Sequence, residues 1–322
     1  MMPVQIATPP NADHPQQAVA APGFCEQALR ITCGDDTLIG ILARPRRPSA
    51  VGVVIIVGGP QYRAGSHRQF TLLARHLAAA GHAVLRFDYR GMGDSSGGAQ
   101  VFLGVSTDIE AAIQALRAGA PDVQQVVLWG LCDAASAALL FIDAQPRSPV
   151  AGLCLLNPWV RSAQTQAAAQ VKHYYTRRLA DRGFWLKLLR GQVGAGRLAE
   201  FWRSLRTMRS RRPGGAGPPV ALSFQHRMAR AWREANCPLL LVLSGQDLTA
   251  KEFTEALASD PAWQGALDHP LLTRVDLVDA DHTFSSAAAR EAVAQATTAW
   301  LRPLATMAAL PSVAVPTSRA GR

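Results

Sequence analysis

The chain has 322 residues, of which 48% are hydrophobic, and a formal net charge of +10 at pH 7. This length accommodates one large domain or two ordinary ones, and the hydrophobic content excludes an intrinsically disordered chain. No apolar run approaches the ~18 residues of a transmembrane helix, and the first residues lack the basic start and apolar stretch of a secretory signal. We therefore expect a soluble cytoplasmic protein without a transmembrane segment, for which peripheral membrane contact stays open.

The cysteines argue against a disulfide framework and against a zinc site. They are odd in number, widely scattered and without a C-x-x-C pair; they are Cys25, Cys33, Cys132, Cys154 and Cys237. Thiols stay reduced in the cytoplasm, so free cysteines are expected there. We interpret all of them except Cys132 as small buried hydrophobes, and we expect neither a metal nor a cofactor.

Strand and helix patterns alternate along most of the chain after a leading hairpin at residues 27–32 and 37–43. Predicted strands cover residues 51–57, 83–91, 124–130, 150–157, 239–245 and 272–278, and predicted helices cover residues 68–80, 106–116, 133–142, 250–258 and 285–301. Ser106, Thr107 and Asp108 are residue types that can cap the second of these helices. The alternation predicts an α/β fold with a doubly wound, mostly parallel sheet.

One segment interrupts this alternation and carries the excess charge. Between Arg161 and Arg233 there are sixteen basic and two acidic residues, a net charge of +14, whereas the rest of the chain carries −4. We predict a basic helical cap at residues 160–233, inserted into a core made of residues 22–159 and 234–303. Residues 1–21 and 304–322 are expected to be loose tails.

The strand ending at Gly130 leads into a helix through the sequence G-L-C-D-A. A strand, a G-x-nucleophile-x-small turn and a helix form a nucleophile elbow, in which the small Gly130 and Ala134 permit a sharp turn. Cys132 would then lie at the positive end of a helix, which stabilises a thiolate. The alternative is a buried structural cysteine. Ser136 falls inside the helix, and we interpret it as a packing or capping residue.

Two further polar residues follow predicted strands, Asp247 in LSGQD and His282 in DADHTF. Carboxyl ends of parallel strands meet at one edge of a sheet, so Cys132, Asp247 and His282 are expected to converge there. The order nucleophile, acid, base is that of a catalytic triad in this type of sheet. Asp279 and Asp281 are closer to His282 in sequence, but the strand-end position favours Asp247.

Further motifs make the chain resemble the α/β-hydrolase superfamily over roughly residues 25–303. They are GGPQYR (58–63), at the place of an oxyanion loop, and DYRGMGDS (88–95), similar to a turn of many esterases. More narrowly, GGPQYRAGSHRQF, FDYRGMGDSSG, WGLCDAASAA and SGQD resemble the first type of hydrolase associated with exosortase A (PEP-CTERM) systems. That resemblance implies a bacterial cytoplasmic enzyme linked to sorting and exopolysaccharide machinery. Most superfamily members use serine at the elbow, and the dienelactone hydrolase branch uses cysteine.

The resemblance implies an acyl hydrolase or acyltransferase that works through an acyl-enzyme. A thiolate nucleophile favours esters, thioesters and lactones over amides, because an amine is a poorer leaving group than the thiolate. The oxyanion hole is expected to use the backbone N–H of Asp133 and that of Gly59 or Gln61, because proline at position 60 has none. Asp88 and Arg90 are interpreted as structural residues. For His67 and Arg68 two interpretations stay open: they only begin a helix, or their side chains face the pocket.

The substrate class is open at this point. The basic cap either packs an apolar stripe over the site with a solvated charged face, or attracts an anionic acyl donor such as a CoA or carrier-protein thioester, a sugar phosphate or an anionic lipid. Nucleic acid is not expected, because there is no helix-turn-helix or zinc pattern. The alternative function is a catalytically retired scaffold that binds an anionic partner through its cap.

Overall fold

The computed structural model describes residues 23–59, 61–161 and 222–308. Its strands are β1 (Phe24–Cys33), β2 (Asp36–Pro45), β3 (Val51–Ile56), β4 (Val84–Phe87), β5 (Gln125–Leu131), β6 (Val150–Leu156), β7 (Leu239–Ser244) and β8 (Leu272–Leu277). In this part of the chain they form one eight-stranded sheet in the order β1-β2-β4-β3-β5-β6-β7-β8. β1 and β2 form the predicted antiparallel hairpin, β2 pairs antiparallel with β4, and all other neighbours are parallel. The predicted mostly parallel sheet is confirmed.

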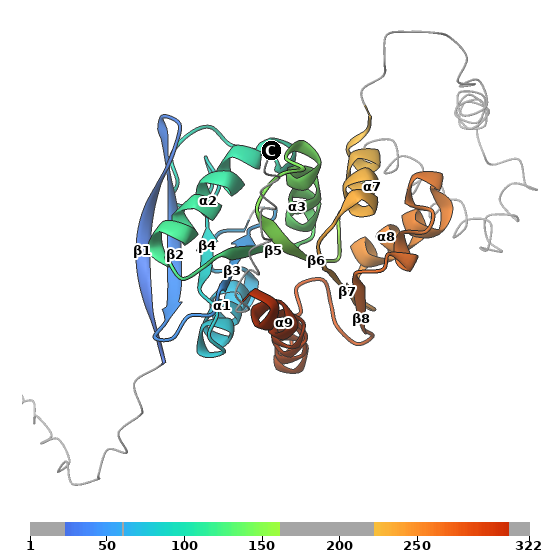
Figure 1. Cartoon of the computed structure of the whole chain (residues 1–322). Coiled ribbons are helices and arrows are strands. Elements are labelled where there is room, and N and C mark those ends of the chain that lie inside the picture. The colour runs from blue at the N-terminus through green and yellow to red at the C-terminus, as the bar shows by residue number, and fades with distance from the viewer. Residues whose placement is uncertain (1–22, 60, 162–221, 309–322) are drawn as a thin grey trace, which may run out of the picture.

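Helices cover both faces of this sheet (Figure 1). The longer ones are α1 (Gln69–Ala79), α2 (Ser106–Gly119), α3 (Asp133–Ala144), α7 (Phe224–Glu234), α8 (Leu248–Ser259) and α9 (Ala287–Ala308), and the short 3-10 turns are η1 (Ser66–Arg68), η2 (Phe102–Gly104), η3 (Pro261–Trp263) and η4 (Ala266–Asp268). α1 and α9 pack on one face, and α2, α3, α7 and α8 pack on the other. None of these helices is both long and apolar enough to cross a bilayer.

The central strands explain why two cores form. Along β3, Val54 and Ile56 belong to the core under α2 and α3, whereas Val53 and Ile55 belong to the core under α1 and α9. Successive side chains of a strand point to opposite faces, so a continuous apolar run is buried on both sides only between two helical layers. The run at residues 51–57 is fully buried, as the sequence predicts.

The last part of the predicted cap belongs to the core instead. α7 packs against α3, and its Met228 and Trp232 are fully buried. Two basic residues of this helix, Arg227 and Arg230, form ion pairs of 2.7 Å with the buried carboxylate of Asp143. The boundary predicted at residue 233 is therefore too late, because the amphipathic pattern of a core helix and that of a cap helix look alike in sequence.

The other predicted boundaries concern the end of the closing helix and the segments that the structure does not describe. The closing helix α9 runs to Ala308, beyond the predicted core boundary at residue 303. The remainder of the predicted cap, residues 162–221, lies outside the described residues, as do residues 1–22 and 309–322 of the predicted tails.

The predicted capping of α2 is wrong. Val105 occupies its N-cap position, and no side chain caps the helix there. Asp108 is fully buried and accepts hydrogen bonds from the backbone and guanidinium of Arg90. Asp88 likewise accepts from the backbone N–H and guanidinium of Arg63. Asp88 and Arg90 thus hold the turn after β4 in place, which agrees with their structural interpretation.

Candidate active site

Cys132 is the single residue between β5 and α3. Its backbone has φ 63° and ψ −125°, a conformation that costs a non-glycine residue about 1–3 kcal/mol and is concentrated at functional sites. The backbone N–H of Cys132 donates to the carbonyl oxygen of Leu156 at 2.8 Å. A Cβ on Gly130 would lie 2.5 Å from the backbone carbon of Ala134, so only glycine allows the strand and helix to approach this closely. The predicted sharp turn is confirmed.

Asp247 and His282 follow the adjacent strands β7 and β8. The His282 Nδ1 atom lies 2.9 Å from the Asp247 Oδ2 atom. The hydrogen bond to Asp247 and a second one to the thiol of Cys132 raise the pKa of His282 to about 10. Because Nδ1 faces Asp247, the ring nitrogen available to the thiol is Nε2. The structure therefore brings the three predicted side chains together, with the imidazole between the carboxylate and the sulfur.

The carboxylate of Asp247 is held from two sides. It forms the N-cap of α8 and accepts the backbone N–H groups of Thr249 at 3.0 Å and Ala250 at 3.1 Å. Burial is the largest single effect and opposes its charge, but the hydrogen bond and charge of His282 together with the two backbone N–H groups outweigh it, so the pKa of Asp247 is lowered. Asp281, the alternative partner, instead accepts the backbone N–H groups of Thr283 and Ser285 within its own turn. Asp247 is thus the residue that orients the imidazole.

Asn157, directly after β6, is a positioning residue that the sequence interpretation missed. It is fully buried and has φ 43°. Its Oδ1 accepts the backbone N–H of Ser244 at 2.9 Å, and its Nδ2 donates to the Ser244 hydroxyl at 2.9 Å and to the His282 carbonyl at 3.4 Å. It joins the ends of β6 and β7 to the segment after β8 that carries His282, called the histidine loop below. The available signal was a polar residue after an apolar strand, in the sequence LLNP.

Gly59 and Asp133, the two expected oxyanion-hole residues, are in contact through the side chain of Asp133. The backbone N–H of Gly59 donates to the side-chain Oδ2 of Asp133 at 3.0 Å. The N–H group expected to bind a substrate oxygen is therefore occupied by a carboxylate of the chain itself. Burial raises the pKa of Asp133. Gln61, the alternative donor, uses its side-chain oxygen to accept the backbone N–H of Ser66 at 3.4 Å.

His67 and Arg68 are exposed residues of η1 at the start of α1. Both have positive φ, 52° and 59°. The hydrogen bond from Ser285 is the main reason why the pKa of Asp281 is lowered, and the charge of His67 contributes. His67 therefore lies close enough to Asp281, in the histidine loop, for its charge to act there.

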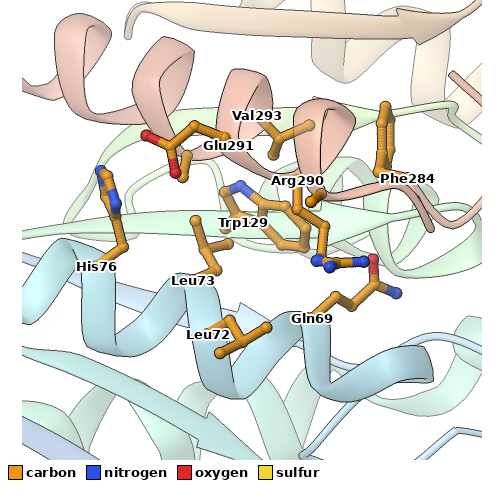
Figure 2. Close-up of a pocket in the computed structure, with 11 residues that line it drawn as sticks. Gln69, Leu72, Leu73, His76, Trp129, Phe284, Arg290, Glu291 and Val293 are labelled. Carbon is orange, nitrogen blue, oxygen red and sulfur yellow. The ribbon is translucent and has the colours of Figure 1, made fainter. Parts of the chain in front are cut away.

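A cavity of about 270 Å³ lies between α1 and α9. Figure 2 shows the indole of Trp129 at its centre, with Gln69 and Arg290 to one side and His76 and Glu291 to the other. Neither Cys132 nor His282 lines it, so this cavity is separate from the converging side chains. Within the ranges that the structure describes, no group of His, Cys, Asp and Glu side chains is arranged to hold a metal ion.

The model of a family described as Alpha/beta hydrolase family matches residues 53–296. No curated protein sequence is similar enough to count as a relative.

Several solved structures are similar in fold. The esterase Pf2001 of Pyrococcus furiosus aligns with a TM-score of 0.57 and 15% identity over 87% of this chain and 93% of its own. A dienelactone hydrolase from Anabaena variabilis aligns with a TM-score of 0.54 and 17% identity over 87% and 98%. A proline iminopeptidase from Mycobacterium smegmatis aligns with a TM-score of 0.53 and 14% identity over 88% and 100%. At these identities the likeness concerns the fold.

Proposed function

Because the chain belongs to the alpha/beta hydrolase family, we propose that it is an acyl hydrolase or acyltransferase whose nucleophile is the thiol of Cys132. The observation that carries this proposal is the contact of one imidazole, that of His282, with both the Asp247 carboxylate and the Cys132 thiol. The sharp turn that holds Cys132 at the N-terminus of α3 supports it as well.

The proposed reaction has two steps. The Cys132 thiolate attacks the carbonyl carbon of the acyl donor, a bond between sulfur and carbon forms, and the bond to the leaving group breaks. His282 holds the proton taken from the thiol and delivers it to the leaving group. Asp247 orients the ring through Nδ1 and stabilises its charged form. Water or another acceptor then attacks the thioester, takes the acyl group and restores the thiol.

The proposed substrates are esters, thioesters or lactones. A thiolate expels an alkoxide or thiolate more easily than an amine, which disfavours amides. The structures similar in fold include an esterase and a dienelactone hydrolase, but also a proline iminopeptidase, so the proposed class rests on the thiol nucleophile. The five cysteines are all free, which supports a reducing, cytoplasmic location. The link to exosortase systems rests on the sequence motifs, and we keep it as part of the proposal.

The substitution Cys132→Ala tests the nucleophile. We expect the wild-type protein to release p-nitrophenol from a short acyl ester with a burst, and we expect Cys132→Ala to lose both burst and turnover. Mapping with iodoacetamide gives a second readout, in which we expect Cys132 to be labelled before the other thiols. Burial protects Cys33 and Cys154, and the exposed Cys25 gives the labelling rate of an accessible thiol that Cys132 has to exceed. Wild-type turnover in Cys132→Ala would show that another residue is the nucleophile.

A second candidate function is a retired scaffold that binds an anionic partner. The occupation of the Gly59 N–H by the Asp133 carboxylate favours it, because an oxyanion hole filled by the protein does not stabilise a tetrahedral intermediate. A thiol-acylating probe separates the two functions. An enzyme is acylated at Cys132, and much more slowly in the substitution His282→Ala, whereas a retired scaffold shows no dependence on His282.

A further inference from the structure

The carboxylate of Asp133 lies where an acyl-transfer site needs free backbone donors. Its Oδ2 accepts the Gly59 N–H at 3.0 Å. The nearby backbone N–H groups of Asp133 itself and of Ala134 act against burial and lower the pKa of this carboxyl, although burial prevails. These N–H groups belong to the N-terminus of α3 and to the loop after β3, and the positive end of a helix is a typical anion site. In the structure the anion bound at this position is the Asp133 carboxylate of the protein itself.

The surroundings of Asp133 are built around this position. A Cβ on Gly58 would lie 2.2 Å from the Asp133 Oδ1 atom, so glycine at position 58 is what lets the carboxylate approach the loop. Oδ1 is itself buried and has no hydrogen-bond partner among the described residues, and the buried hydroxyl of Tyr89 has none either. The negative charge of Asp133 acts on both Tyr89 and His282. The carboxylate is thus half satisfied, a state from which it can be displaced.

We propose that Asp133 determines which acyl donors react, because its carboxylate competes with the substrate's carbonyl oxygen for the Gly59 N–H. This inference rests on the proposed function. A carbonyl oxygen becomes an oxyanion during attack and gains most from this donor at the transition state. Asp133 therefore has to turn away before Cys132 can be acylated, and small neutral esters, which bring little binding energy to displace it, react slowly.

Two reactions of the same thiol separate this effect from the nucleophile's own reactivity. In acylation by p-nitrophenyl acetate, the sulfur–carbon bond forms at the carbonyl, an oxyanion develops, and p-nitrophenolate leaves. In alkylation by iodoacetamide, the sulfur–carbon bond forms as iodide leaves, and no oxyanion develops. Only the first reaction needs the oxyanion hole. The ratio of the acylation rate to the alkylation rate cancels changes in thiolate content.

The experiment compares this ratio in wild type, Asp133→Asn and Asp133→Ala. We expect Asp133→Ala to raise the ratio at least about tenfold, since one oxyanion donor is worth a factor of about 10²–10³. Asp133→Asn is expected to lie between the two, because its amide oxygen still accepts the Gly59 N–H without a charge. Asp279→Asn, which removes an exposed carboxylate three residues before His282, is the matched control and leaves the ratio unchanged.

Other outcomes overturn the inference in distinguishable ways. An unchanged or lower ratio in Asp133→Ala, with alkylation of Cys132 intact, means that Asp133 merely holds the loop and that its position does not limit acylation. Acylation by p-nitrophenyl acetate that persists at the wild-type rate in Cys132→Ala refutes the proposed function and the inference with it. Alkylation is followed at Cys132 by peptide mapping, because the exposed Cys25 also reacts with iodoacetamide. If Asp133→Ala does not fold, the same comparison is made with Asp133→Asn, for which a ratio no higher than that of wild type is equally decisive.

Discussion

His282 is the residue at which folding, protonation and chemistry are most directly coupled. Its hydrogen bonds to Asp247 and Cys132 raise its pKa to about 10, compared with about 6.5 for an unperturbed histidine. In the folded protein the ring therefore keeps its proton at neutral pH and presents a cation beside the sulfur. Asp247, whose pKa is lowered, supplies the matching negative charge.

This coupling predicts a pH dependence of stability. Below about pH 6.5 the histidine is protonated in both the folded and the unfolded chain, so the contribution of the charged pair is fully present. As the pH rises toward 10, the unfolded chain loses the proton first, and the contribution disappears. We expect the difference in free energy of unfolding between wild type and His282→Gln to be largest near pH 6 and to shrink toward pH 10. Urea unfolding across this range measures it, and a pH-independent difference would contradict the assigned pKa.

At the level of elements, the junction of β5 and α3 determines where Cys132 lies. The strand continues into the helix with a single residue between them, and Gly130 faces the backbone of Ala134. Because the atoms opposite Gly130 are backbone atoms and not the end of a flexible side chain, neither partner moves aside easily. The position of the thiol thus depends on a residue that carries no chemistry of its own.

We expect Gly130→Ala to lower the free energy of unfolding by about 1–3 kcal/mol, the usual cost of overpacking, and to lower the acylation rate of Cys132. Gly98→Ala is the matched control, because no atom lies within 4 Å of its added Cβ. Urea unfolding and p-nitrophenyl acetate kinetics of both variants test this. Equal stability of Gly130→Ala and Gly98→Ala would mean that the junction tolerates a wider turn.

At the scale of the whole molecule, charge is distributed unevenly along the chain. The segment from Arg161 to Arg233 carries +14 and the rest carries −4. Part of this excess is neutralised locally, since Arg161 pairs with Glu252 and two arginines of α7 pair with one core carboxylate. Ion pairs at contact distance have little reach, so long-range attraction of an anion depends on the basic residues that remain.

Two roles stay open for these residues, attraction of an anionic acyl donor and solubility of a cap with a solvated basic face, and the first of them predicts a salt dependence. The value of kcat/KM for an anionic donor should then fall with salt, because the Debye length shrinks from about 10 Å at 0.1 M to about 3 Å at 1 M. The value for a neutral ester should barely change. Reversal of Arg177, Arg178 and Arg182 to Glu should lower the first value and spare the second. Equal salt profiles for both substrates would leave the segment with solubility as its only electrostatic role.

The sequence by itself determined the features that are encoded locally. The apolar run at residues 51–57 identified a strand buried on both faces, because its side chains have no polar alternation. The glycine and alanine on either side of Cys132 identified the sharp turn, since a turn of this kind excludes larger side chains. The order of Cys132, Asp247 and His282 was readable because each follows a recognisable strand, and strand ends of a parallel sheet converge.

Only the tertiary structure decided the contacts between segments far apart in the chain. Gly59 and Asp133 are 74 residues apart, and their hydrogen bond depends on β3 and β5 being neighbours and on one side-chain rotamer. Asn157 reaches Ser244 and His282 because β6 and β7 are adjacent. The assignment of α7 to the core depends on α3 offering a complementary surface. Residue patterns report what each segment can bury, whereas strand order and side-chain rotamers arise from the packing of all segments together.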